Sequence, residues 1–147
     1  MQPHDLKTFL DARGIPCRMA GNDGIVFRHG EYPLVLACDP GDPDYASISM
    51  QAAFAVPPGM DAQEAVRLVT AADQRVKVAK SALLHLERGQ ATVGIRAEVL
   101  ASPEGFARFF DLHVRAVLRA ADVIYDALAA ARPTSGQAGP ASTEAVR

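Results

Sequence analysis

The sequence predicts an α+β domain in which an antiparallel five-stranded sheet carries helices on one face. Segments whose apolar and polar residues alternate follow one another through short turns, so that neighbouring strands can form hairpins. The chain also contains a long apolar segment with helical periodicity, residues 102–131, which needs a sheet to cover it. The predicted order of elements is helix, three strands, helix, two strands and a long helix.

The composition is typical of a single globular domain. The chain has 147 residues, of which 49% are hydrophobic and 22% are charged, and a chain of this size can bury one core. Its formal net charge is -2 and its basic residues are scattered along the sequence. We therefore expect no nucleic-acid partner, because phosphate binding needs basic residues clustered on one face.

The sequence also indicates the cellular compartment. It has no run of about twenty apolar residues that could span a membrane, and its first residues lack the pattern of a signal peptide. We therefore expect a cytoplasmic protein with no membrane partner. Cys17 and Cys38 lie in unrelated segments and are expected to be reduced thiols rather than a disulfide.

The first half of the chain is predicted to contain one helix followed by strands. The helix is expected to run from about Pro3 to Arg13, because apolar residues recur there at helical spacing and Gly14 is a natural C-cap. A period of two then predicts a short strand in residues 17–20, a turn at residues 21–24, and strands in residues 25–29, 32–38 and 45–54. The predicted order of elements counts three strands here, one fewer than these segments. Residues 39–44 consist of Asp, Pro and Gly and are expected to form a loop.

The second half is predicted to contain a helix, a hairpin and the long helix. The helix is expected to begin after Asp61, because Glu64 three residues later completes a pattern like a capping box. A strand is expected to follow directly from Val76, and a turn at residues 87–90 leads to the clear alternation of residues 92–99. Residues 132–147 lack periodicity and are rich in Pro, Ser, Gly and Ala, so the domain is expected to span residues 1–131 and a mobile tail to follow it.

The long helix is expected to begin after Ser102, a natural N-cap, with Pro103 at its first position. At about 100° per residue its charged side chains form one narrow polar stripe, which consists of Arg108, Asp111, Arg115, Arg119, Asp122 and Asp126. Apolar residues cover roughly two-thirds of the circumference, more than one sheet can bury. The centre of this apolar arc is expected to pack on the sheet and consists of Phe106, Phe110, Val117 and Ile124.

Two apolar flanks border this centre. One flank consists of Phe109, Leu112 and Val123, and the other consists of Val114, Leu118 and Tyr125. We predict that one of the two flanks, without specifying which, stays exposed as a dimer or partner surface, because exposed apolar patches mark interaction sites. A two-fold contact would let this patch meet its copy on a second chain. The alternative is that the first two helices or the opening loop cover it within one chain.

Residues that could carry chemistry are few. The sequence contains no catalytic motif of the nucleophile-elbow, P-loop, dinucleotide-binding or zinc-protease type. His113, on the apolar arc of the long helix, is interpreted as a core or interface histidine. A cluster of three carboxylates is interpreted as a solvated turn in preference to a calcium or magnesium site, and it consists of Asp39, Asp42 and Asp44. We therefore expect no catalytic residue, no cofactor and no metal.

One stretch carries a family resemblance. Residues 65–69, Ala-Val-Arg-Leu-Val, lead through residues 75–78, Arg-Val-Lys-Val, into a hairpin and a long final helix. This pattern resembles the YbjN family, which is grouped as candidate bacterial sensory transduction regulators and shares the type III secretion chaperone-like fold. The resemblance covers roughly residues 5–131, and it departs from the family at residues 70–72, where Thr-Ala-Ala replaces the usual Asn.

The resemblance implies the same order of elements, a bacterial origin and frequent homodimerisation. Secretion chaperones of this fold bind an extended segment of a client protein. Together with the apolar excess, this favours a non-enzymatic protein-binding module, chaperone-like or regulatory, that forms a homodimer and takes up a peptide by edge pairing or in an apolar groove. The alternative is a small-molecule sensor or weak enzyme with a pocket between the sheet and the long helix, near His113, Tyr45 and Met50.

Overall fold

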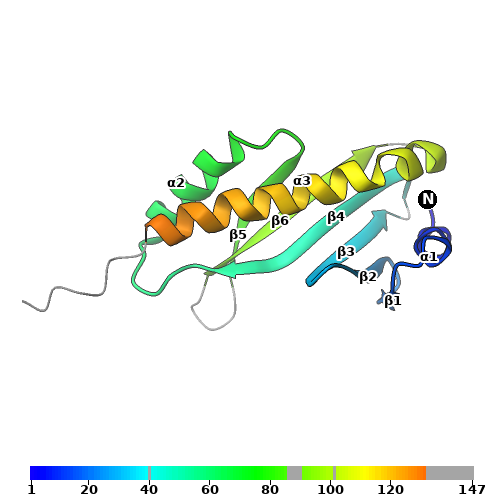
Figure 1. Cartoon of the computed structure of the whole chain (residues 1–147), viewed down its shortest axis with the longest axis horizontal. Helices are drawn as coiled ribbons and strands as arrows, with labels where there is room; N and C mark the ends of the chain where they lie inside the picture. Colours follow the sequence, from blue (N-terminus) through cyan, green and yellow to red (C-terminus); the bar gives the residue numbers. More distant parts are fainter. Residues whose placement is uncertain (40, 86–90, 101, 132–147) are drawn as a thin grey trace, which may run out of the picture.

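The computed structural model describes residues 1–39, 41–85, 91–100 and 102–131. Within them the elements follow one another in the order α1 (Pro3–Ala12), β1 (Cys17–Ala20), β2 (Gly24–His29), β3 (Tyr32–Asp39), β4 (Asp42–Ala55), α2 (Ala62–Asp73), β5 (Ala79–His85), β6 (Ala91–Leu100) and α3 (Pro103–Ala130) (Figure 1). The strands form one antiparallel sheet in the order β1-β2-β3-β4-β6-β5. The predicted α+β class and antiparallel pairing are confirmed. The predicted mobile tail, residues 132–147, and the turn predicted at residues 87–90 lie outside the described residues.

The predicted number of five strands is wrong, because the described sheet has six. Four strands precede α2 instead of the three counted, because each of the four segments with a period of two is a strand. The first of them pairs as β1 with β2, from Cys17 opposite Phe27 to Ala20 opposite Gly24. Between β1 and β2, Gly21 has a φ of 70°, a left-handed conformation that costs other residues free energy. The glycine closes a hairpin here, and the short segment before it becomes an edge strand.

The turn between β3 and β4 is shorter than the loop predicted over residues 39–44. β3 continues to Asp39 and β4 already begins at Asp42, and these two residues pair. The Asp39 carboxylate accepts a hydrogen bond from the Gly41 backbone N–H, with 2.8 Å between Oδ1 and N. An Asp side chain that binds the backbone two residues on stabilises a tight turn, so the same residue types that indicated a loop close a hairpin.

The strand after α2 begins later than predicted. β5 starts at Ala79 rather than at Val76, because Val76 still donates its backbone N–H to the carbonyl of Asp73 at the end of the helix. The Asp73 carboxylate then accepts hydrogen bonds from the Ser81 backbone N–H and from the Ser81 hydroxyl, at 3.1 and 2.7 Å. One side chain therefore joins the end of α2 to β5.

One face of the sheet forms the core together with the helices. Alternate residues of β2, β3, β4 and β6 are buried on it, including Ile25, Phe27, Leu34, Leu36, Ile48, Val93 and Ile95. α3 runs over β4 and β6, α2 lies beside its C-terminal half, and α1 lies near β1 and the start of α3 (Figure 1). The residues of α3 predicted to pack on the sheet are buried as predicted: Phe106, Phe110, Val117 and Ile124.

The ends of α3 agree with the prediction. The Ser102 hydroxyl accepts a hydrogen bond from the Gly105 backbone N–H, with 3.3 Å between Oγ and N, and the helix ends at Ala130. α2 also begins after Asp61 as predicted, although the Asp61 side chain makes no capping hydrogen bond. Among the described residues, no helix is long and apolar enough to cross a membrane.

Candidate interaction surface

Most of the residues predicted to form a partner surface are exposed or half-buried on the two flanks of α3. Phe109, Leu112 and Tyr125 are 42%, 46% and 54% exposed, and Leu118 is half-buried against the core. We call these four residues the outer apolar residues of α3. Their contact with a partner stays a prediction.

Val114 and Val123 do not belong to this surface, because both are buried within the single chain. Their burial means that the predicted division into one covered and one exposed flank is wrong, since each flank has buried and exposed members. The reason lies in the lengths of the helices: α2 has 12 residues and α3 has 28. α2 covers one flank only along the C-terminal half of α3 (Figure 1), where Val123 lies, and leaves Phe109 and Leu112 uncovered.

Each of the two exposed aromatic rings of α3 contacts a neighbouring side chain. The Arg108 guanidinium carbon lies 5.3 Å from the centre of the Phe109 ring, within the range of a cation–π contact. The Tyr125 ring lies 5.8 Å from the ring of Phe54 on β4. The alternation of residues 45–54 does not reveal the place of Phe54 beside Tyr125, because this contact depends on how α3 crosses the sheet.

The polar stripe of α3 is exposed throughout. Near its start, the Arg13 guanidinium donates a hydrogen bond to the Asp111 carboxylate, with 2.7 Å between Nη2 and Oδ2. The Arg13 guanidinium carbon also lies 5.3 and 5.7 Å from the ring centres of Phe9 and Phe110. This end of the stripe is therefore occupied by α1, and the remainder of the stripe faces solvent.

The three residues named for a pocket beneath the long helix do not share a site. His113 Nδ1 lies 2.9 Å from the Phe109 carbonyl oxygen, which places a proton on Nδ1 because a carbonyl can only accept. Tyr45 and Met50 point to opposite faces of β4, because their positions in the strand differ by five and successive side chains alternate. The Tyr45 hydroxyl lies 3.2 Å from a Glu98 carboxylate oxygen, and Met50 is buried.

A cavity does lie between the sheet and α3, but at other residues. It measures about 240 Å³ and is lined by Ala53, Phe54, Ala55, Pro57, Tyr125, Leu128 and Ala129. The lining is apolar apart from backbone atoms and the Tyr125 hydroxyl. Its chemistry suits a small apolar group and offers no acid or base for catalysis near neutral pH.

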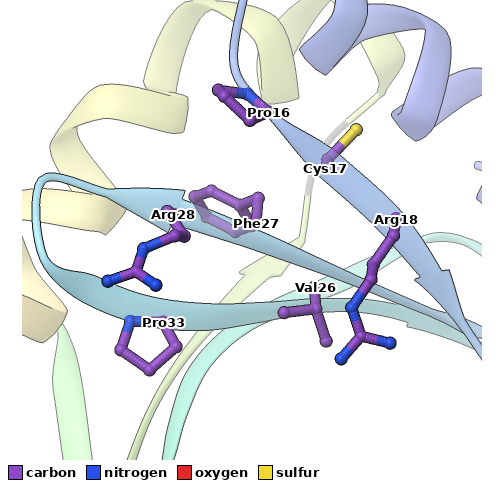
Figure 2. Close-up of a pocket in the computed structure, with 7 residues that line it drawn as sticks. All are labelled: Pro16, Cys17, Arg18, Val26, Phe27, Arg28 and Pro33. Atoms are coloured by element: carbon purple, nitrogen blue, oxygen red, sulfur yellow. The ribbon is translucent and has the colours of Figure 1, made fainter.

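A larger cavity of about 410 Å³ opens beside the edge strand β1 (Figure 2), and it is lined by Pro16, Cys17, Arg18, Val26, Phe27, Arg28 and Pro33. Arg18 and Arg28 extend to the same side of the sheet (Figure 2), because Arg18 pairs with Val26 and Val26 is two residues from Arg28. The lining has no carboxylate and no histidine. Sequence reasoning missed this arginine pair, although the alternation on both sides of the turn at residues 21–24 places both residues on one face.

The two cysteines are free thiols, as predicted. The Cys17 thiol donates to the Asp11 carboxylate, with 3.4 Å between Sγ and Oδ1. Burial and then this hydrogen bond raise the pKa of Cys17 above its ordinary value, and burial raises the pKa of Cys38. Because the thiolate is the reactive form, both thiols are poor nucleophiles near neutral pH.

Asp39, the last residue of β3, and Asp42, the first residue of β4, bind backbone groups through their carboxylates. Asp39 accepts from Gly41, and Asp42 accepts from the backbone N–H of Asp44, with 3.0 Å between Oδ1 and N. Within the described ranges, no group of three or more His, Cys, Asp or Glu side chains is placed to hold a metal ion. These hydrogen bonds agree with the interpretation of the segment as a turn.

Comparisons with known proteins reveal the same fold in two solved structures. No family model and no curated protein matches the chain. The structure is similar to that of YbjN from E. coli, described as a candidate transcription regulator, with a TM-score of 0.64 and 14% identity over 86% of this chain and 91% of that one. It is also similar to an uncharacterised protein from Methanothermobacter thermautotrophicus, with a TM-score of 0.56 and 17% identity over 87% of this chain and 99% of that one. At these identities the likeness shows the fold alone.

Proposed function

We propose that this protein is a non-enzymatic protein-binding module, chaperone-like or regulatory, that acts as a homodimer. The observation that carries the proposal is the exposure of Phe109, Leu112 and Tyr125 on α3. A single exposed apolar residue needs no explanation, but these three share one helix whose inner face already supplies the core. Covering such side chains with another protein removes apolar area from water, which is the main driving force of protein association.

The likeness to YbjN supports the regulatory form of this proposal and membership of a divergent branch of its family. The free thiols of Cys17 and Cys38 support a reducing compartment such as the cytoplasm. Among the described residues, the cavities hold no pair of acid and base groups, so a binding role requires fewer assumptions than catalysis.

Binding to an array of extended peptides tests the proposal. We expect the wild-type chain to select a subset of peptides and the double variant Phe109→Ser with Leu112→Ser to lose at least about tenfold in affinity, since two apolar contacts are removed. Val66→Ser is the matched control, because Val66 is 50% exposed on α2 and lies outside the outer apolar residues of α3. Failure of every peptide to bind, or equal binding by the double variant, would contradict a protein-binding role for α3.

The second candidate is a sensor of a small apolar molecule, and the cavity beside Phe54 and Tyr125 favours it. The cavity is smaller than the usual ligand pocket of about 300–1,000 Å³, which ranks this candidate second. Thermal shift against a metabolite panel distinguishes the two, because a ligand at a hundred times its dissociation constant adds about 2.7 kcal/mol to the free energy of unfolding. If no metabolite raises the melting temperature and peptides bind, the sensor is excluded. If a metabolite raises it and no peptide binds, the protein-binding module is excluded.

A further inference from the structure

Four charged residues occupy the middle and C-terminal part of the outer face of α3. Arg115 and Arg119 come first, and Asp122 and Asp126 follow. All four are exposed, and at about 100° per residue they lie within an arc of about 60°. The helix therefore presents a positive block followed by a negative block on one narrow face.

Part of this order of charges is unfavourable within one chain, although Arg119 and Asp122, three residues apart, have a favourable spacing. Arg115 and Arg119 are four residues apart, as are Asp122 and Asp126, and like charges at this spacing repel on a helix surface. Asp126 also lies next to the last turn of α3, where the helix dipole favours cations. In the part of the chain that the structure describes, the salt bridges join Lys7 to Asp11, Arg13 to Asp111 and Arg96 to Glu98, and they include none of the four.

An antiparallel second copy of the same helix would place aspartates opposite the two arginines and arginines opposite the two aspartates. We propose that α3 packs against α3 of a second copy about a two-fold axis that passes between residues 120 and 121. Arg115 then lies opposite Asp126 of the other copy, and Arg119 lies opposite Asp122. The two-fold symmetry repeats both pairs, so the four charged side chains of one copy form four pairs of opposite charge with those of the other copy. This inference rests on the homodimer of the proposed function and specifies its partner surface and orientation.

The same register brings apolar residues together beside the charges. On the helix surface Leu118 and Tyr125 border the charged arc on one side, and Leu112 borders it on the other. In the antiparallel pair Leu118 of one copy comes beside Tyr125 of the other, because a two-fold axis across both helices keeps each flank on its own side. Leu112 likewise comes beside Ala130, which is exposed near the end of the helix.

The two groups of residues have different roles. Exposed ion pairs add little affinity, because water and salt screen them, so the apolar side chains supply most of the attraction. Charges specify orientation, since like charges placed opposite one another disfavour the wrong arrangement. A parallel pair would place Arg115 opposite Arg115 and Asp122 opposite Asp122, which disfavours that orientation.

Mixing two oppositely charged variants tests the arrangement. An acidic variant carries Arg115→Glu and Arg119→Glu, and a basic variant carries Asp122→Arg and Asp126→Arg. All four sites are exposed, so the fold, checked by circular dichroism, should be retained. We expect the full-length wild type to be dimeric in sedimentation equilibrium, each variant alone to dimerise at least about tenfold more weakly, and an equimolar mixture to form a heterodimer. A chain with all four substitutions should dimerise again.

The outcomes separate this inference from the proposed homodimer. If each variant alone dimerises as tightly as the wild type, the dimer uses another surface and the inference is wrong, while the homodimer stands. If both variants are monomeric and their mixture stays monomeric, the antiparallel register is wrong. If the wild type itself is monomeric throughout the accessible concentration range, both the homodimer and the inference are overturned.

Discussion

Arg13, just after α1, and Asp111, in the first half of α3, form a hydrogen-bonded ion pair that joins the first helix of the chain to the last. Because the two side chains are 38% and 55% exposed, the ion pair itself should contribute under about 1 kcal/mol. Arg13 also covers the rings of Phe9 and Phe110. Its alkyl stem and guanidinium therefore stabilise the fold independently of Asp111.

Arg13→Ala should consequently cost more than Asp111→Asn. We expect the free energy of unfolding to fall by about 1 kcal/mol for the first variant and by about 0.5 kcal/mol or less for the second. Urea denaturation of both single variants and the double variant measures this difference. Equal losses from the two single variants would mean that the aromatic contacts contribute nothing.

Phe110 is the centre of the aromatic cluster beneath α1. Its ring lies 5.2 Å from that of Phe9 and 5.7 Å from those of Phe27 and Phe106, and it is 1% exposed. Phe110→Ala should cost about 3–5 kcal/mol in the free energy of unfolding, a large part of the usual total of about 5–15 kcal/mol. Phe109→Ala is the matched control, since the neighbouring ring is 42% exposed. Thermal and urea unfolding at low protein concentration should separate the two variants clearly.

Asp73 accepts two hydrogen bonds from Ser81 and joins α2 to β5. Asp73→Ala should lower the free energy of unfolding by about 1–3 kcal/mol, because it leaves a part-buried N–H and hydroxyl without their charged acceptor. Asp61→Ala should cost much less than the usual N-cap loss of about 1 kcal/mol, since Asp61 makes no capping hydrogen bond. Similar losses in the free energy of unfolding from the two variants would argue against a stabilising role for the hydrogen bonds between Asp73 and Ser81.

The Cys38 thiol should make the free energy of unfolding fall as the pH rises into the alkaline range. Burial raises the pKa of its thiol in the folded chain above the ordinary value of 9.0. Below that value both folded and unfolded chains keep the proton, whereas above it the unfolded chain ionises first, so stability falls as pH rises. The urea midpoint of the wild type should drop more between about pH 7 and about pH 10 than that of Cys38→Ala. An identical drop in both chains would contradict this account.

Several elements could be predicted because local signals determine them. Ser102 and Pro103 begin α3, Gly21 closes the first hairpin, and the alternation along β6 matches its burial on one face. The period of two also located the four strands before α2, but the count of three was wrong. β1 has only four residues, and its status as a separate strand depends on pairing with β2.

The candidate surface was predicted less completely than the fold. Helical periodicity placed Leu112 and Tyr125 on opposite flanks of the apolar arc and predicted that only one flank stays exposed, whereas both residues are exposed. It could not place Val123, whose burial depends on how far α2 extends along α3. The place of Phe54 beside Tyr125 likewise depends on how α3 crosses β4. Periodicity describes one element, whereas these contacts depend on two.

The mass of the full chain in solution tests the central claim, that the outer face of α3 is a protein contact. Sedimentation equilibrium in the micromolar range, at a salt concentration of about 0.15 M, should give twice the mass of one 15.6 kDa chain. The dimer should weaken when salt is raised, because ion pairs between exposed side chains are screened. A mass of one chain at every concentration would contradict the account.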